Sequence, residues 1–361
     1  MRPTWAEINL KALSQNFLRT TELIGEKVKV MAIVKADAYG HGAVKVSQEL
    51  QELECHMFGV ATVDEAMELR HSGIKAPIVI LSGICSDEID TVVKNNLTPV
   101  AFDTQFLKEL NKYAGKNNTK IKYHLKVDTG MNRLGFQSNK LNEYFSQILT
   151  LNNIIMEGVF THLSSADCDN AYTAEQISLF KESCLQINDK GFKPSYYHSA
   201  NSAALQRFKQ SHFNLVRPGI MIYGASAAED IFLHPVMKLK TRIIQIKEIP
   251  KGSRVSYGGT FVADRPTKIA VLPIGYADGY SRHLSNKGLV SLKNTTAPVI
   301  GQVCMDLIII DITEVQDVKL GDEVVLFGDE NISVDKLASL VDTISYELLS
   351  IVGKRVPRVY L

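Results

Sequence analysis

The chain has 361 residues, more than one small domain needs and enough for a barrel of about 250 residues with a smaller partner domain. Hydrophobic residues make up 45% and charged residues 22%, the balance of a globular protein with a large core. The 40 Lys and Arg residues nearly match the 39 Asp and Glu residues, and a net charge of +1 argues against nucleic acid or a membrane surface as partner.

The amino terminus and the cysteines indicate where the protein works. The first residues, MRPTWAE, lack the apolar segment of a signal peptide, and no window reaches the length of a membrane span. The 5 cysteines are odd in number and show no C-x-x-C spacing, which favours neither a disulfide framework nor a zinc site. We therefore expect a cytoplasmic protein with reduced cysteines and no metal centre.

Short apolar runs alternate with amphipathic segments over the first two thirds of the chain. The apolar runs are Val28–Val34, Met57–Ala61, Ile78–Ser82, Thr98–Phe102, Ile121–Val127, Ile155–His162, Tyr196–Ala200 and Leu215–Arg217. The segments between them that look helical include Ala43–Leu53, Asp64–His71, Thr104–Tyr113 and Ala174–Asn188. Continuous apolar strands that alternate with helices predict parallel pairing through right-handed crossovers. Eight such units close a (β/α)₈ TIM barrel.

An open, doubly wound sheet is the competing fold. Such a sheet normally carries a glycine-rich fingerprint directly after its first strand, where it binds a dinucleotide. The segment after Val28–Val34 has no such fingerprint. The pattern therefore favours the barrel.

The pattern of apolar and polar residues changes after residue 230. Strand candidates are Met237–Ile249, Lys268–Leu272, Leu289–Lys293, Pro298–Ile312 and Glu323–Phe327, and helix is expected only near Val334–Ile351. This pattern predicts a mainly antiparallel β domain over residues 231–361, after a barrel over residues 11–230. Residues 1–10, which include the strand-like stretch Thr4–Leu10, are expected to pair with the second domain.

Lys35 stands at the end of the first predicted barrel strand. Catalytic groups of such barrels lie at the C-terminal ends of the strands and in the loops that follow. A lysine that closes the apolar run Val28–Val34 must find a partner or shift its pKa. A surface lysine that lays its stem along apolar residues is the simpler reading of any single Lys. The position and the glycine-flanked loop after Lys35 favour function.

Polar side chains also follow four later strands. They are Lys126, Asp128, Arg133, His162, His198, Asn201, Ser202, Arg217, Gly219 and Tyr223. The loops after strands seven and eight of a barrel often hold a phosphate, and Asn201, Ser202 and Gly219-Ile220 could do so here. A phosphate anchor opposite a strand-end lysine suits a phosphorylated aldehyde cofactor. It would equally suit a Schiff-base aldolase, and the spacing alone leaves both open.

An ordered set of motifs decides between these readings. In the barrel they are Ala32–Gly42, Lys126–Gly135, Thr161–Leu163, His198–Ala203 and Val216–Gly224, and in the second domain Val255–Gly258, Ile274–Gly279, Gly301–Asp306 and Ser345–Glu347. The chain closely resembles alanine racemases in these segments, which span nearly its whole length in the family's order. The resemblance implies a barrel followed by a β domain, in agreement with the pattern above.

The resemblance also implies an activity and a cofactor. Alanine racemases use pyridoxal 5′-phosphate (PLP) to interconvert L-alanine and D-alanine by a two-base mechanism, and so supply D-alanine for peptidoglycan. The expected form is a cytoplasmic homodimer whose active site is shared between subunits. Lys35 would carry the cofactor and act as one base, and Tyr257 from the neighbouring subunit would act as the other, because racemisation needs a proton-transfer group on each face of Cα.

The family's cofactor-binding residues match positions across the barrel. Besides Lys35, they are Tyr39, His162, Asn201, Ser202, Arg217, Gly219, Ile220 and Tyr346. Tyr39, Ser202, Gly219, Ile220 and Tyr346 would hold the phosphate. Arg217 would face the pyridine nitrogen and, because an arginine only donates, would leave that nitrogen unprotonated and the cofactor a weaker electron sink.

The family match extends to the substrate. Arg133 and the Met305 backbone would bind the carboxylate, supported by Lys126, which is carbamylated in some family members. The chain Tyr257–His162–Arg217 would help the phenol act as a base, with His198 supporting Arg217.

The same match predicts the access corridor. Tyr276 would crowd it with Tyr257 and Tyr346, and Asp167 and Arg282 would lie further out. Gln302 departs from the family, since many members carry Arg in Gly-Arg-Val-Cys-Met-Asp, and this changes the charge of the outer corridor.

Three other functions are alternatives to an alanine racemase. A decarboxylase of the same fold should present an acidic partner to the pyridine nitrogen, where this chain offers Arg217. A broad-specificity racemase of the same fold type is the other near alternative. A PLP carrier without catalysis would need no second base and leaves Tyr257 unexplained, so we expect an alanine racemase.

Overall fold

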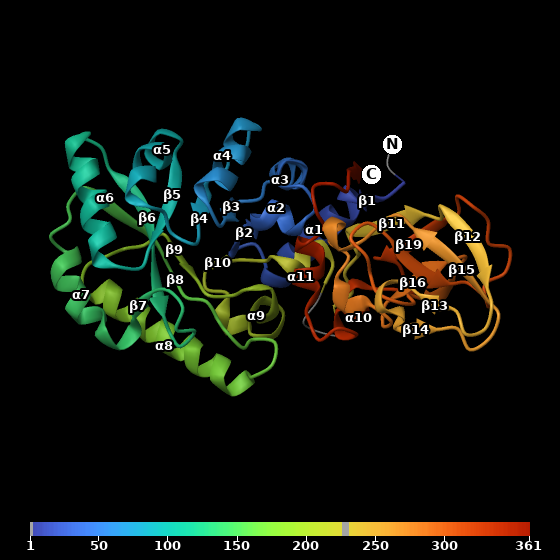
Figure 1. The fold of residues 1–361 in the computed structure, drawn as a ribbon. Coiled ribbons are helices and arrows are strands. Elements are labelled where there is room, and N and C mark those ends of the chain that lie inside the picture. The colour runs from blue at the N-terminus through green and yellow to red at the C-terminus, as the bar shows by residue number, and fades with distance from the viewer. Residues whose placement is uncertain (1–2, 226–230) are drawn as a thin grey trace.

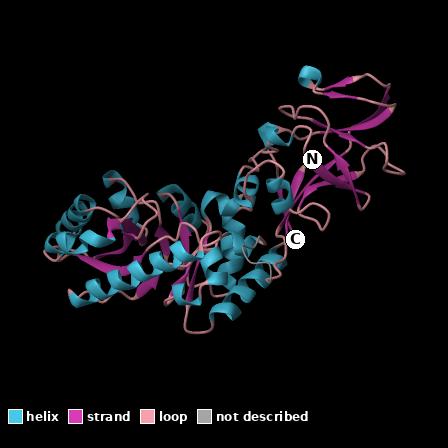
Figure 2. Ribbon diagram, turned by 90° about the horizontal axis from the view of Figure 1, so that it is seen from below, coloured by secondary structure: helices cyan, strands magenta, loops and turns pink. Residues whose placement is uncertain are grey.

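A computed structural model describes residues 3–225 and 231–361 and divides them into a barrel and a β domain that lie side by side (Figure 1). Seen from below, the barrel helices surround the parallel strands, and the β domain projects from one side of the barrel (Figure 2). Within the described residues, no helix has the length and apolar character needed to cross a membrane.

Eight parallel strands form the barrel wall. In chain order they are β2 (Lys29–Ile33), β3 (Met57–Val60), β4 (Ile78–Ile80), β5 (Leu97–Ala101), β6 (Ile121–Asp128), β8 (Ile154–Phe160), β9 (Tyr196–His198) and β10 (Leu215–Val216). The spatial order is β10-β2-β3-β4-β5-β6-β8-β9, and the two-residue strand β7 (Phe136–Gln137) adds to β6. The predicted barrel is confirmed. Strands such as β3 and β4 are buried at every position, which is why their sequences are continuously apolar.

The wall closes irregularly between β9 and β10. Among the described residues these two strands form no ladder, but the Asn214 amide donates to the Tyr197 carbonyl at 3.4 Å and the Arg217 amide donates to the Ala200 carbonyl at 2.9 Å. These bonds bring the ends of the two strands together. The loops that carry the predicted phosphate-binding residues therefore leave the wall side by side.

Helices cover the outside of the barrel (Figure 1). They are α1 (Leu10–Ile24), α3 (Ala43–Glu52), α4 (Val63–His71), α5 (Ile89–Lys94), α6 (Thr104–Lys116), α7 (Leu141–Ile148), α8 (Asn170–Asp189) and α9 (Ser202–Arg207). Side-chain oxygens cap several first turns, as Asn9 does for α1, Asp103 for α6 and Asn201 for α9. Each cap satisfies a backbone N–H that has no partner inside its helix.

The second domain is built from three small sheets. Its strands are β11 (Met237–Arg242), β12 (Gln245–Ile249), β13 (Arg254–Val255), β14 (Phe261–Val262), β15 (Thr267–Leu272), β16 (Leu289–Leu292), β17 (Thr295–Pro298), β18 (Ile308–Asp311), β19 (Glu323–Phe327) and β20 (Arg358–Tyr360). The largest sheet has the order β17-β16-β19-β11-β1-β20, and the others are β12-β15-β18 and β13-β14. Strand β1 (Trp5–Ile8) pairs antiparallel with β11 and parallel with β20. The expectation of a mostly antiparallel second domain is confirmed.

Three element predictions in this domain are wrong in detail. The run Met237–Ile249 is two strands in different sheets, because the Ile243 amide bonds to Asp322 and the next amide bonds to Val271. The expected strand Pro298–Ile312 is not continuous, because Pro298 ends β17, Gly301 turns the chain with φ +74°, and only residues 308–311 form the next strand. The expected helix Val334–Ile351 is two short helices, α10 (Val334–Ser339) and α11 (Ser345–Ser350), separated where Asp342 is left-handed.

Candidate active site

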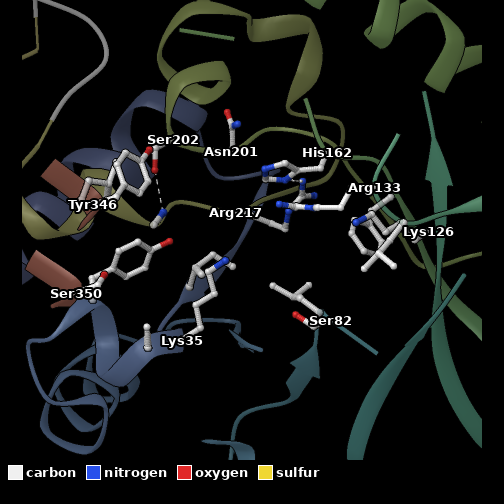
Figure 3. Close-up of a pocket in the computed structure, with 18 residues that line it drawn as sticks. Lys35, Ser82, Lys126, Arg133, His162, Asn201, Ser202, Arg217, Tyr346 and Ser350 are labelled. Carbon is white, nitrogen blue, oxygen red and sulfur yellow. Dashed lines mark hydrogen bonds between the residues drawn. The ribbon is translucent and has the colours of Figure 1, made fainter. Parts of the chain in front are cut away.

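A cavity of about 530 Å³ opens at the C-terminal ends of the barrel strands, with α11 along one side (Figure 3). Its lining includes eleven of the predicted site residues. They are Lys35, Tyr39, Lys126, Arg133, His162, Asn201, Ser202, Arg217, Gly219, Ile220 and Tyr346. The strand ends therefore converge as the barrel fold requires.

The charge of the cavity is one-sided. Lys35, Lys126, Arg133 and Arg217 line it, and no carboxylate is among the lining residues that the structure describes. Throughout residues 3–225 and 231–361, no group of three His, Cys, Asp or Glu side chains could hold a metal ion. Four cations in one concave site favour anionic ligands such as a phosphate and a carboxylate.

Lys35 projects into the middle of the cavity from the end of β2 (Figure 3). Burial and the nearby Arg133 guanidinium lower the pKa of its ammonium, and Glu65 opposes them. A lysine with a lowered pKa has more neutral amine near neutral pH, the form that attacks a carbonyl or takes a proton.

The chain directly after Lys35 makes a left-handed turn. Ala36, Asp37, Ala38 and Tyr39, in the segment labelled α2 (Lys35–Tyr39), have φ values of +52° to +53°. Left-handed helix costs roughly 1–2 kcal/mol per residue, so four in succession persist only where the surroundings hold them. This turn aims the Lys35 and Tyr39 side chains into the same cavity.

Two carboxylates hold the left-handed turn. Glu65 Oε1 accepts from the Ala36 amide at 2.7 Å, while Oε2 accepts from the Ala61 amide at 2.7 Å. Asp37 Oδ1 accepts from the Ala43 amide at 2.7 Å and so ties the turn to the start of α3. The backbone around the candidate catalytic lysine is thus fixed by side chains from two neighbouring βα units.

The Gly219 loop forms a cradle on the other side of the cavity. A Cβ at Gly219 would lie 2.6 Å from the Tyr39 hydroxyl oxygen, so only glycine allows this approach. The buried Ser202 hydroxyl accepts from the Gly219 amide at 2.9 Å, the dashed line in Figure 3, and its own proton remains available to a ligand oxygen. Tyr346 closes the same side of the cavity. Burial and, to a lesser extent, the negative charge of Asp167 raise the pKa of its phenol to about 12, so the phenol stays a neutral donor.

Arg217 is buried at the base of the cavity among acceptors. It donates to His198 Nδ1 at 2.7 Å, to the Thr161 carbonyl at 2.7 Å and to the Ser199 carbonyl at 3.0 Å, while His162 Nδ1 lies 3.5 Å away. Burial lowers the pKa of its guanidinium to about 9, so Arg217 remains a cation at neutral pH. Burial and Arg217 together lower the pKa of His162 well below its usual value, which keeps that imidazole neutral.

Lys126 and Arg133 face the cavity from the β6 side (Figure 3). The Lys126 ammonium lies 5.7 Å from the centre of the Phe160 ring. Burial and, after it, the positive charges of Arg133 and Arg217 lower its pKa to about 8. Two adjacent cations repel each other, so an anion between or beside them would relieve the repulsion.

Of the four predicted site residues in the second domain, Tyr346 lines this cavity and the other three do not. Tyr257, Tyr276 and Met305 are 74%, 44% and 52% exposed. They gather in one cluster, because the Tyr276 amide donates to the Cys304 carbonyl and Ser256 Oγ lies 3.3 Å from Cys304 Sγ. A single chain thus presents two separate sets of predicted residues. His198 also stays outside the cavity lining and lies behind Arg217.

The motifs did not identify Glu65, Phe160, Ser82 or His124. Phe160 stacks on His198 with ring centres 4.8 Å apart, and Ser82 lines the cavity. Glu65 could have been found, because Thr62 and Glu65 form the T-x-x-E capping box that starts α4. A buried Phe or His inside a strand has no comparable sequence pattern.

The fold and the site together define a two-domain barrel enzyme that acts on anionic small molecules. The features that define it are a strand-end lysine, a glycine-serine cradle opposite it and a buried arginine beneath them. The alanine racemase N-terminal domain family matches residues 8–227, and the alanine racemase C-terminal domain family matches residues 236–360. The chain belongs to the alanine racemase family.

Individual relatives agree with this assignment over the whole chain. The chain is 43% identical to the alanine racemase of Halothermothrix orenii, over 99% of this chain and 97% of the relative. The structure of alanine racemase from Clostridium difficile 630 has a TM-score of 0.94 and 36% identity, covering 99% of this chain and 96% of that one. The alanine racemase from Bartonella henselae with covalently bound pyridoxal phosphate has a TM-score of 0.93 and 28% identity, and each chain is covered completely.

Proposed function

We propose that this protein interconverts L-alanine and D-alanine with PLP as cofactor. The observation that carries the proposal is Lys35 at the end of β2, facing the Gly219–Ser202 cradle across a cavity lined by cations. The chemistry of this donor set fits PLP, whose phosphate, phenolate and bound amino-acid carboxylate are all anionic. Family membership supports the same activity.

The residues that would hold PLP follow from the cavity. Tyr39, Ser202, Gly219, Ile220 and Tyr346 would bind the phosphate, with Asn201 and His162 beside the ring. Lys35 would attach the cofactor covalently, and Arg217 would donate to the ring nitrogen. When bound, PLP withdraws electrons from the substrate Cα and makes its proton acidic.

The remaining chemistry belongs to the chain's own side chains. Lys35 takes a proton at Cα from one face as the neutral amine, a form that its lowered pKa favours, and returns it as the ammonium. The phenol of Tyr257, presented by a second subunit, serves the opposite face. Arg133 and the Met305 backbone orient the substrate carboxylate, and Lys126 supports Arg133.

Assembly is part of the proposal. Because Tyr257, Tyr276 and Met305 are exposed in one chain, a homodimer would place this cluster over the cavity of the partner. The tyrosines would then restrict the cavity to small side chains, which favours alanine. We propose that the dimer works in the cytoplasm and supplies D-alanine for peptidoglycan.

Two measurements test the proposed function. Purified protein loaded with PLP is assayed for D-alanine formation from L-alanine, with L-serine and L-lysine as competing substrates. Borohydride reduction followed by peptide mass spectrometry should then place the cofactor on Lys35. The proposal fails if no D-alanine forms or if the label lies on another lysine. Faster conversion of lysine or serine would identify a racemase of broader specificity.

A further inference from the structure

Behind Arg217, two histidines continue a row of hydrogen bonds into the barrel core. His198 from β9 receives a hydrogen bond from Arg217 at Nδ1, and its Nε2 lies 2.9 Å from Nδ1 of His124 on β6. Both imidazoles are completely buried. The row therefore connects the floor of the candidate active site to a residue that touches no ligand.

The chemistry of Arg217 sets the direction of every bond in this row. A guanidinium only donates, so His198 Nδ1 must accept with its lone pair. Burial and the charge of Arg217 lower the pKa of His198 well below its usual value and that of His124 to about 3, so each ring carries one proton. The His198 proton then sits on Nε2 and is donated to His124 Nδ1, which leaves the His124 proton on Nε2.

The position of His124 is built into the barrel wall. The register between β6 and β8 shifts between Tyr123 and His124, and Gly158 lies opposite the imidazole. A Cβ at Gly158 would come within 2.6 Å of the ring atoms Cε1 and Nδ1. Only glycine leaves room for the ring that accepts the His198 proton.

The far end of the row faces a negative charge. Nε2 of His124 has no hydrogen-bond partner among the described residues, and Oε2 of Glu157 lies 3.9 Å from it. The other oxygen of this carboxylate pairs with Lys122 at 2.6 Å. A carboxylate favours an N–H on the ring edge that it faces, which is the same tautomer that Arg217 dictates from the opposite end.

We propose that His124 is a positioning residue for the reaction: by accepting the Nε2 proton of His198, it fixes the tautomer that gives Arg217 an acceptor and holds the guanidinium in place. The inference rests on the proposed function, because Arg217 there faces the ring nitrogen of PLP. His124 acts only through His198. The row of histidines binds no ligand of its own and controls the orientation of Arg217.

A matched pair of substitutions tests the acceptor. Asn and Leu have nearly the same shape, so His124→Asn and His124→Leu leave similar cavities, but only Asn can place an oxygen where Nδ1 stood. We expect His124→Leu to lower kcat at least tenfold relative to His124→Asn, with little change in KM for alanine. A buried N–H left without a partner is costly, and a tenfold effect corresponds to about 1.4 kcal/mol.

Thermal unfolding of both loaded variants separates positioning from packing. If kcat falls equally in the two variants, or falls only in proportion to the loss in Tm, His124 is a packing residue and the proposal is overturned. Rescue of kcat by Asn at a similar Tm supports the role as acceptor.

A second readout does not depend on turnover. In the holoenzyme labelled with ¹⁵N-histidine, NMR shifts distinguish protonated from unprotonated ring nitrogens, and single-residue variants assign the signals. We expect protonated Nε2 and bare Nδ1 in both His198 and His124. A proton on Nδ1 of either ring, or a doubly protonated ring, overturns the inference. Absence of racemase activity would instead defeat the proposed function, whichever tautomers are found.

Discussion

Lys126 is a buried cation beside two other cations, and this arrangement has a measurable cost. Its side chain is 5% exposed on β6, and burial, Arg133 and Arg217 lower its pKa from 10.5 to about 8. The unfolded chain therefore binds more protons than the folded chain between these two values. The cost to folding is complete below about pH 8 and disappears as the pH rises toward 10.5.

Replacing this lysine should therefore stabilise the protein. We expect Lys126→Met to raise the free energy of unfolding at pH 7 by about 1 to 3 kcal/mol, and by much less at pH 10. Urea unfolding at the two pH values measures the difference, with exposed Lys45→Met as the control that should change little at either pH. A loss of stability at pH 7 would mean that the side chain is anionic, as a carbamate would be.

At the scale of elements, the junction of β2, the left-handed turn and α4 positions the site. Glu65 at the start of α4 accepts from the Ala36 amide in the turn and also completes the capping box with Thr62. One carboxylate thus caps a helix and holds the strained backbone that follows Lys35. The two duties can be separated, because Thr62 contributes only to the cap.

Two alanine substitutions separate these duties. Thr62→Ala should cost about 1 kcal/mol of stability, the usual loss for an N-cap. Glu65→Ala should cost more, because it also leaves the Ala36 amide without its acceptor, and it should weaken PLP binding by releasing the turn that carries Tyr39. Chemical unfolding and PLP titration of both variants measure the two effects. Equal PLP affinity in both variants would show that Glu65 does no more than cap the helix.

The whole molecule presents its two sets of candidate site residues in different places. Lys35 lies in the barrel cavity, and Tyr257 lies exposed in the second domain and outside the lining of that cavity. If the site is shared, a Lys35→Ala subunit and a Tyr257→Phe subunit form a dimer with one defective and one intact site.

Mixing these subunits provides the test. Each variant alone should be nearly inactive, and random reassociation of equal amounts should restore about one quarter of the wild-type activity, since half of the dimers are mixed and each has one intact site. Native mass spectrometry verifies that mixed dimers form. If verified mixed dimers stay inactive, Lys35 and Tyr257 do not act across the subunit boundary.

The sequence by itself determined the barrel and the residues around its mouth. Parallel strands buried on both faces need unbroken apolar runs, such as those of β3 and β4, so periodicity identified the wall. Catalytic groups of a barrel follow its strands, so position along the chain identified Lys35 and Arg217. Local information was enough here because each of these features is written in a few consecutive residues.

Only the tertiary structure decided the features that depend on partners far away in the chain. Strands β11 and β12 separate because two adjacent amides meet acceptors in different sheets. His124 takes its place because Gly158 on the neighbouring strand has no side chain, and the left-handed turn after Lys35 exists because Glu65 holds it. The strain of such a turn and the burial of such an imidazole are offset by long-range contacts, which no local pattern of residues records.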